Sequence, residues 1–339
     1  MMKLLNKSQV FARLSLALAL AGGASCANAQ AQTNTDANWP TKPVRIVAVF
    51  PPGGSVDQVA RALAAQLSTQ LNQQFIVENK GGGAGTIGAT AVAQSPGDGY
   101  TLGVVFDTHG VNPSLIPNMP FNTTKDLASV MLIGTAPMVV VAHPSQPFKT
   151  FKDVIAASKA KPGSVAYGTI GSGSLGHLAM NQISNLSGVE FNHVPYRGGG
   201  PLITDVLGGQ VPVAIGTVFL LNPQVKAGKL IPLGITTKKA DPQMPGVSPI
   251  ADQGLPGLSH FEAVAWWGVI ASASTPPALV KRINEELAKA LKAPALSDKL
   301  GAQGLDILAS SPAQMDSFLR LEIERWAKVV KDNKIKAGD

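Results

Sequence analysis

Two glycine-rich stretches decide how this chain folds: Phe50-Pro51-Pro52-Gly53-Gly54-Ser55-Val56-Asp57 and Ile170-Gly171-Ser172-Gly173-Ser174-Leu175-Gly176-His177. Each follows an apolar run and leads into a helical pattern. A strand that turns through bare backbone into a helix directs unpaired N–H groups and the positive end of the helix dipole at one point. Such a point binds an anion, so the sequence predicts two anion-binding turns.

Strands and helices alternate around the first turn. A β-branched run at 44–49 is followed by a helix over 59–71, with apolar residues every four positions, and then by strands at 75–77 and 100–105. Strands that alternate with helices predict a mainly parallel α/β sheet, whose ligand crevice lies at the carboxyl ends of the strands.

A second alternation begins with the apolar strand 138–142 and runs to about residue 235. The three helices expected between 277 and 333 have no sheet of their own, so we expect them to return to the first domain. The chain then crosses between domains twice, near 138 and near 268, which makes a hinge. We expect a leader over 1–29, a linker over 30–39, a first domain over 40–137 and 268–339, and a second domain over 138–267.

The N-terminus has the pattern of a secretory leader. Basic residues precede the apolar stretch Leu14–Ala21, and Ala27-Asn28-Ala29 has the small-x-small form that a signal peptidase cuts. The apolar stretch is about half the roughly 20 residues that a membrane span needs. We expect cleavage near Ala29 and a periplasmic protein; the alternative is that Cys26, the only cysteine, is lipidated.

Composition excludes several classes of protein. The net charge of +7 falls to +4 once Lys3, Lys7 and Arg13 are removed with the leader, and the remaining basic residues are scattered. Aromatic residues are 5% of the chain, so the pattern of a nucleic-acid binder is missing. Without a thiol in the mature chain, disulfides and cysteine nucleophiles are excluded. No histidine has metal-ligand spacing, and we expect no metal or cofactor.

The stretch Gly83-Ala84-Gly85-Thr86-Ile87-Gly88 also fits a dinucleotide-binding pattern, with Asp107 near the position of a ribose-binding acid. An exported chain has little access to nicotinamide nucleotides, which favours a glycine turn at a smaller anion site. Both interpretations stay open.

Hydroxyl and imidazole side chains surround the predicted crevice. Ser172, Ser174 and Thr169 lie outside any Gly-x-Ser-x-Gly nucleophile motif and are expected to donate to a carboxylate, or else to cap a helix. His109 and His177 lie beside loops at strand ends, where ligand contact and plain packing are equally plausible. The three other histidines, His143, His193 and His260, are expected to be structural.

Arg197 is the one fixed positive charge expected near the crevice, and its planar guanidinium suits a carboxylate. A salt bridge across the hinge is the alternative role. Asp205, on the following helix, could accept from a polar ligand group or anchor the loop. Of Trp266 and Trp267 at the second crossing, we expect at least one to lie in the core.

Several ordered motifs together resemble the Bug family, the periplasmic solute receptors of tripartite tricarboxylate transporters. They are Trp39-Pro40-x-Lys42-Pro43-Val44-Arg45, the Phe-Pro-Pro-Gly-Gly-x-x-Asp turn at 50–57, Glu78-Asn79 with the glycine run to Gly88, Pro96-Gly97-Asp98-Gly99-Tyr100-Thr101-Leu102, His109-x-x-Asn112-Pro113, Pro195-Tyr196-Arg197-Gly198 and Gly209-Gln210-Val211. The resemblance runs from residue 39 to the C-terminus. It implies a two-lobed, type II-like periplasmic-binding fold and an organic acid held between the lobes.

The resemblance also implies which residues contact the ligand. These are Pro52, Gly53, Gly54, Gly83, Ala84 and Gly85 in the first lobe and Thr169, Ser172, Gly173, Ser174, Tyr196 and Arg197 in the second. The adjacent Ser55, Asp57, Thr108, His109, Gly198 and Asp205 complete the candidate set.

Two departures from the family pattern leave the shape of the ligand pocket open. Lys80 stands where arginine is common, and Ala84-Gly85-Thr86 replaces Ala-Gly-Gly. The acid of Phe106-Asp107 would disfavour a ligand carboxylate beside it. We expect a monomeric periplasmic receptor that captures a carboxylate and delivers it to membrane permease subunits. The alternative is an exported α/β enzyme acting on a carboxylate or nucleotide-like ligand, but no activated nucleophile or metal triad is evident.

Overall fold

The computed structural model describes residues 38–332 and 335 of the 339. The chain divides into two compact units, Met1–Thr41 and Lys42–Asp339. Only residues 38–41 of the first unit are described, so the expected leader and most of the expected linker lie outside the described residues. The elements below all belong to the second unit.

Three parallel strands begin the sheet, with β1 (Val44–Ala48) between β2 (Phe75–Asn79) and β3 (Thr101–Phe106). The helices α3 (Ser55–Leu71) and α4 (Thr86–Ala93) connect them. Helix α3 buries the apolar face predicted from the four-residue spacing. The β-α-β-α-β order expected for this region is confirmed, and the carboxyl ends of all three strands lie at one edge.

The long strand β4 (Leu127–Ala142) joins the two parts of the sheet. Its residues 127–137 pair antiparallel with β9 (Val264–Ser272), which also pairs with β3. Its residues 138–142 pair with β7 (Val213–Thr217) and β8 (Ile231–Ile235). The strand predicted at 138–142 is thus the last third of a longer one, and β9 pairs with the first part of the sheet from Val264 onward, ahead of the expected crossing near 268.

The second part of the sheet repeats the parallel arrangement, with β5 (Ala166–Thr169) between β6 (Asn192–Pro195) and β7. Its helices are α6 (Phe151–Ala160), α7 (Leu175–Ser187), α8 (Gly199–Leu207) and α9 (Val218–Lys226), and a short 3-10 turn follows at Ile250–Asp252. Apolar residues of β4, α8 and α9 form a buried core between these layers.

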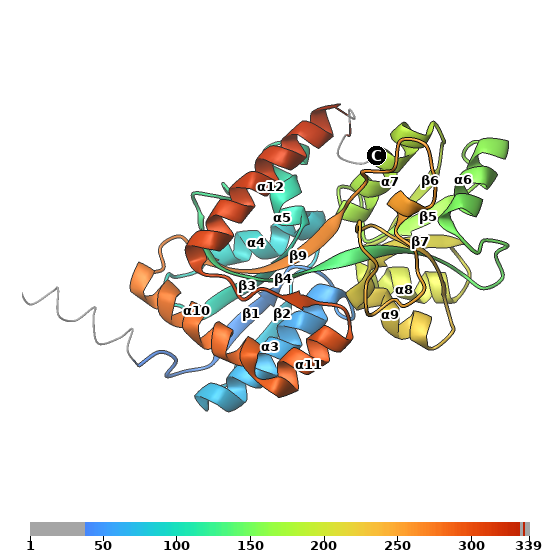
Figure 1. Ribbon diagram of the computed structural model, residues 1–339. Coiled ribbons are helices and arrows are strands. Elements are labelled where there is room, and N and C mark those ends of the chain that lie inside the picture. The colour runs from blue at the N-terminus through green and yellow to red at the C-terminus, as the bar shows by residue number, and fades with distance from the viewer. Residues whose placement is uncertain (1–37, 333–334, 336–339) are drawn as a thin grey trace, which may run out of the picture. The chain divides into compact units, whose positions relative to one another are not determined.

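The C-terminal helices pack against elements from the start of the chain. Helix α10 (Pro277–Lys292) contacts α3 and β4, and α12 (Pro312–Asp332) contacts α5 (Thr108–Leu115) and β4. Figure 1 shows α10 and α11 (Pro294–Ala302) on the same side of the sheet as α3, and α12 beside α5 on the other. The two-residue strand β10 (Asp306–Ile307) pairs with β4.

The described strands run in the order β2-β1-β3-β9-β4-β7-β5-β6, with β8 and β10 also paired to β4. We call β1–β3, β9, β10 and residues 127–137, with α3–α5 and α10–α12, the first lobe. The second lobe consists of β5–β8, residues 138–142 and α6–α9. The expected α/β class with two helix-flanked lobes is confirmed. The sheet is mixed, because β4 and β9 pair antiparallel with their neighbours while β1–β3 and β5–β7 pair parallel.

Candidate functional site

A cavity of about 870 Å³ lies at the carboxyl ends of the strands, and both lobes contribute to its lining. From the first lobe it is lined by Phe50, Pro51, Pro52, Asn79, Gly81, Gly82, Gly83, Ala84, Ile87 and Thr108. From the second lobe it is lined by Ile170, Gly171, Ser172, Ser174, Pro195, Tyr196 and Arg197. Arg197 is the single charged side chain among these lining residues.

The structure brings eight of the predicted site residues to this cavity: Pro52, Gly83, Ala84, Thr108, Ser172, Ser174, Tyr196 and Arg197. Ten others do not line the cavity: Gly53, Gly54, Ser55, Asp57, Gly85, His109, Thr169, Gly173, Gly198 and Asp205. For these ten, direct ligand contact stays a prediction.

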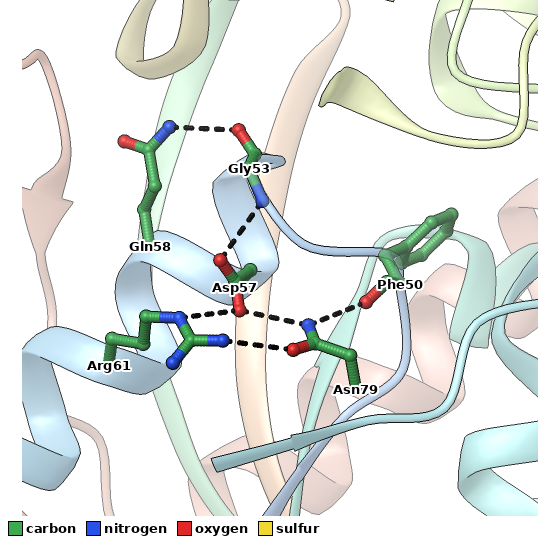
Figure 2. A network of polar contacts seen from close by, with 6 residues as sticks. All are labelled: Phe50, Gly53, Asp57, Gln58, Arg61 and Asn79. Carbon is green, nitrogen blue, oxygen red and sulfur yellow. Dashed lines mark hydrogen bonds and ion pairs between the residues drawn. The ribbon is translucent and has the colours of Figure 1, made fainter. Parts of the chain in front are cut away.

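The carboxylate of Asp57 fixes the loop between β1 and α3 (Figure 2). It accepts from the Gly53 amide at 3.0 Å and from Asn79 Nδ2 at 2.9 Å, and it pairs with Arg61 Nε at 2.9 Å. Asn79 Nδ2 also donates to the Phe50 carbonyl at 3.0 Å. Although burial opposes ionisation, these donors hold the pKa of the Asp57 carboxyl below its usual value. Asp57 therefore positions the loop, and its oxygens are occupied within the protein.

The glycine run after β2 adopts backbone conformations that side chains disfavour. Gly82, Gly83 and Gly85 have φ of 123°, 55° and 94°, and Ala84 has φ of 52° in the left-handed region. The Ala84 carbonyl accepts from Asn112 Nδ2 at 3.0 Å, which ties the run to α5. Strain of this kind concentrates at functional sites. In this chain the glycine run brings the N-terminus of α4 to the cavity, because Gly83, Ala84 and Ile87 all line the cavity.

The second-lobe turn places the N-terminus of α7 at the same cavity. Ser174 caps this helix by accepting from the His177 amide, and Ser174 lines the cavity. The Gly173 amide donates to His177 Nδ1 at 3.1 Å. Ser174 thus performs the capping role that the sequence left open, and the helix dipole favours negative charge at this end.

A stack of three aromatic rings packs against the turn at 171–174. The rings of His177 and His193 lie parallel with centroids 4.1 Å apart, and Tyr167 stacks on His193 at 5.0 Å. Thr169 Oγ1 lies 2.8 Å from His193 Nε2. Neither histidine lines the cavity, so of the two roles considered for His177 the structure supports packing against the turn.

Arg197 is exposed at the cavity wall and forms no ion pair with any other residue in the described part of the chain. The hinge salt bridge considered from the sequence is therefore absent here. Beside it, burial and the hydrogen-bonded carboxylate of Asp205 raise the pKa of the Tyr196 hydroxyl to about 12. Asp205 thus anchors Tyr196, which leaves the Arg197 guanidinium as the free charge at this wall.

The two lobes touch through backbone at the rim of the cavity. A Cβ added at Gly200 would lie 2.7 Å from the Pro52 carbonyl oxygen, and one at Gly199 would lie 3.2 Å from Gly54 Cα. One added at Gly198 would lie 3.0 Å from the Pro51 ring. We call this contact between 51–54 and 198–200 the glycine rim. At positions 199 and 200 only glycine allows so close an approach to the backbone of the first lobe.

Behind the cavity, Asp107 and His109 are buried, with 1% and 4% of their surface exposed. Burial and the nearby Glu322 charge raise the pKa of Asp107 well above its usual value, although the amides of Leu175 and Thr108 oppose this. Burial lowers the pKa of His109 to about 4. The acid that was expected to disfavour a ligand carboxylate therefore lies outside the cavity lining, and its raised pKa favours the uncharged form.

Both tryptophans at the second crossing lie in the core. Trp266 is 1% exposed and Trp267 is 0% exposed, and the Trp267 ring packs against Phe106 and Phe219. Among residues 38–332 and 335, no group of three or more His, Cys, Asp or Glu side chains is arranged to hold a metal ion. No helix in that part of the chain combines the length and apolarity required to cross a membrane.

The sequence profile of the family described as "Tripartite tricarboxylate transporter family receptor" matches residues 59–335. The chain belongs to this family. Protein BugT of Bordetella pertussis is 33% identical over 330 residues, which cover 97% of this chain and 98% of BugT. The resemblance to the Bug family is confirmed.

Two solved structures that are similar to this chain contain carboxylates. The structure of R. palustris Rpa4515 with adipate has a TM-score of 0.83 and 32% identity, covering 88% of this chain and 99% of that one. MatC (Rpa3494) from Rhodopseudomonas palustris, with bound malate, has a TM-score of 0.80 and 28% identity, and the match covers 86% of this chain and 100% of that one. These two carboxylate-containing structures thus share the fold of this chain.

Sequence reasoning missed nine of the cavity-lining residues, among them Phe50, Asn79, Ile87, Ile170 and Pro195. Asn79 ends β2, and polar residues at carboxyl ends of parallel strands are a recognised signal. The apolar residues carry no such signal, because an isoleucine or proline near a turn fits equally well in a core.

Proposed function

We propose that this protein is a periplasmic receptor that captures a small organic acid between its lobes and delivers it to the membrane subunits of a tripartite tricarboxylate-type transporter. The observation that carries the proposal is the convergence of the N-termini of α4 and α7, one from each lobe, with the unpaired Arg197 at a single cavity. Helix N-termini and a free guanidinium bind a carboxylate in complementary ways.

The candidate ligand-binding residues form this site in two layers. The eight lining residues would contact the acid, and the glycine rim and the Asp57 network would hold the loops around it. The lobes would act as domains with a boundary inside β4 near residue 138, and a bound acid would favour the closed arrangement in which the rim is in contact. Export after cleavage near Ala29 and action as a monomer complete the proposal.

The burial of Asp107 argues against the dinucleotide alternative, because a ribose-binding acid must face the ligand. An exported enzyme would also need an activated nucleophile, and Ser174, which lines the cavity, caps a helix instead.

Thermal shift of the mature protein, residues 30–339, against a panel of organic acids and nucleotides tests the proposal. A ligand at 100 times its dissociation constant adds about 2.7 kcal/mol of stability. We expect at least one organic acid to raise the melting temperature while nucleotides leave it unchanged. A shift by nucleotides alone, or turnover of a bound acid, would refute the receptor function.

A further inference from the structure

The cavity has apolar walls and little charge. Seven of its lining residues present only hydrocarbon side chains: Phe50, Pro51, Pro52, Ala84, Ile87, Ile170 and Pro195. Polar side chains come from Asn79, Thr108, Ser172 and Ser174, and Arg197 alone carries a charge. The hydrogen bond between the Tyr196 hydroxyl and Asp205 leaves the ring as the main surface that Tyr196 can offer.

Ile87 is the informative member of this wall. It is the second residue of α4, and 55% of its surface is exposed although it lines the cavity. A Cβ at Gly82 would lie 2.6 Å from Ile87 Cδ1, so the isoleucine lies over the glycine run rather than in the core. An apolar side chain exposed inside a binding cavity is stabilised only when an apolar surface covers it.

The size of the cavity agrees with a ligand that has a sizeable body. Ligand pockets of about 300–1,000 Å³ enclose drug-sized molecules, and this one measures about 870 Å³. A small hydroxy acid would leave much of the apolar wall in contact with water. A ring or hydrocarbon chain would cover it.

We propose that the cargo is a carboxylic acid with an apolar body, either an aromatic ring or an unsubstituted aliphatic chain, and that Ile87 selects for this body. This inference rests on the proposed receptor function and narrows its substrate class. The carboxylate would lie at the helix N-termini and Arg197, and the body would lie along Ile87 and the proline-rich wall. Hydroxylated di- and tricarboxylates would bind poorly, because their polar groups would lose water against apolar side chains without gaining partners.

Calorimetric titration with charge-matched acids tests the inference. Adipate is compared with malate, both dianions, and benzoate and hexanoate are compared with lactate, all monoanions. We expect the apolar-bodied member of each set to bind at least about tenfold tighter, the effect of covering about two apolar carbons.

Two variants at Ile87 test its role, and one matched variant controls for the substitution. Ile87→Thr and Ile87→Ala should weaken binding of the apolar-bodied acids about tenfold and leave weak binding of malate unchanged. Ile76→Thr is the control, because Ile76 is 53% exposed on β2 and does not line the cavity. It should bind as the parent protein does. Two Ile87 variants of different polarity guard against a folding defect in either one.

Tighter binding of malate than adipate would overturn the inference and leave the receptor function standing. An equal loss of both classes of acid in the Ile87 variants would also overturn it, since Ile87 would then not select. If no acid of either class binds, the receptor function fails and the inference fails with it.

Discussion

Gly200→Ala is predicted to weaken cargo binding although Gly200 itself does not line the cavity. Gly200 lies in α8, and its Cα is part of the glycine rim. The added Cβ would lie 2.7 Å from the Pro52 carbonyl oxygen, closer than real Cβ contacts come. The obstacle is backbone that the Asp57 network holds in place through Gly53, so the two lobes must separate slightly to relieve it.

The size of the effect follows from the cost of that overlap. Overpacking by one methyl group typically costs about 1–3 kcal/mol. If the lobes close on cargo, the whole cost falls on the bound state and raises the dissociation constant about 5- to 150-fold. Where the lobes of the free protein are separated, the substitution should be harmless, since alanine in a helix is more stable than glycine by about 0.5–1 kcal/mol.

The assay combines calorimetric titration with thermal unfolding of the free protein. Gly301→Ala is the control, because Gly301 also lies in a helix, α11, and a Cβ there meets no atom within 4 Å. We expect weaker binding for Gly200→Ala alone and no loss of melting temperature for either variant. Unchanged affinity in Gly200→Ala would show that the glycine rim plays no part in binding, and the closure argument would be wrong.

Four other perturbations have defined outcomes. Arg197→Ala should weaken binding of a carboxylate by about 1.5–3 kcal/mol in calorimetry, the worth of a hydrogen bond to a charged group, and unchanged affinity would exclude Arg197 from the site. Asp57→Ala should lower the free energy of unfolding by about 1.5–3 kcal/mol in urea titrations because the Gly53 amide and Asn79 lose a charged acceptor; a stability equal to the parent's would exclude the loop-fixing role. His109 has a folded pKa of about 4, below its ordinary value, so the unfolded chain takes up the proton first and stability falls by up to about 3 kcal/mol as pH drops from 6.5 toward 4. His109→Gln should flatten that acid limb in melting curves, and an unaltered slope would contradict the assignment. Asp107 has a raised folded pKa, so its contribution to stability is lost as pH rises above 3.8; Asp107→Asn should therefore raise the melting temperature more at pH 8 than at pH 4, and an equal change at both would refute it.

Local sequence was sufficient for the regular elements. The continuous β-branched run forms β1, because such a run is typical of a strand buried on both faces. The four-residue apolar spacing forms α3, because it gives a helix one apolar face to bury. The helices α5 and α9 were not expected, because Pro113 and Pro223 lie inside them. In α5, contact with α12 supplies stability that the local sequence lacks.

The long strand β4 shows a second limit of sequence reasoning. Its last five residues form an uninterrupted apolar run, whereas the shorter run at 130–133 is followed by Gly134 and Pro137. Two register shifts against β9, between Ser129 and Met131 and between Leu132 and Gly134, interrupt the pairing there. A bulged strand loses the simple alternation on which strand prediction depends.

The candidate site was predictable where backbone chemistry defines it and not where packing does. Glycine turns before helices can be recognised in the sequence, because few other residues adopt their backbone conformations. Whether Ile87 or Ile170 faces a cavity or a core depends on where the opposite lobe lies, and no local pattern contains that information. For the same reason Asp107 was expected near the cleft, while the structure buries it behind the lining.

The cavity and the glycine rim come from the same two stretches of chain. Phe50–Pro52 line the cavity and continue into the rim at 53–54, and Tyr196–Arg197 line it and continue into 198–200. A ligand that fixes the lining residues must therefore also fix the rim, which lies within three residues of them on loops held by Asp57 and Asp205. Each rim contact needs the other lobe, so ligand binding and the distance between the lobes depend on the same equilibrium between open and closed forms. A ligand shifts this equilibrium only as far as it binds the closed form more tightly than the open form.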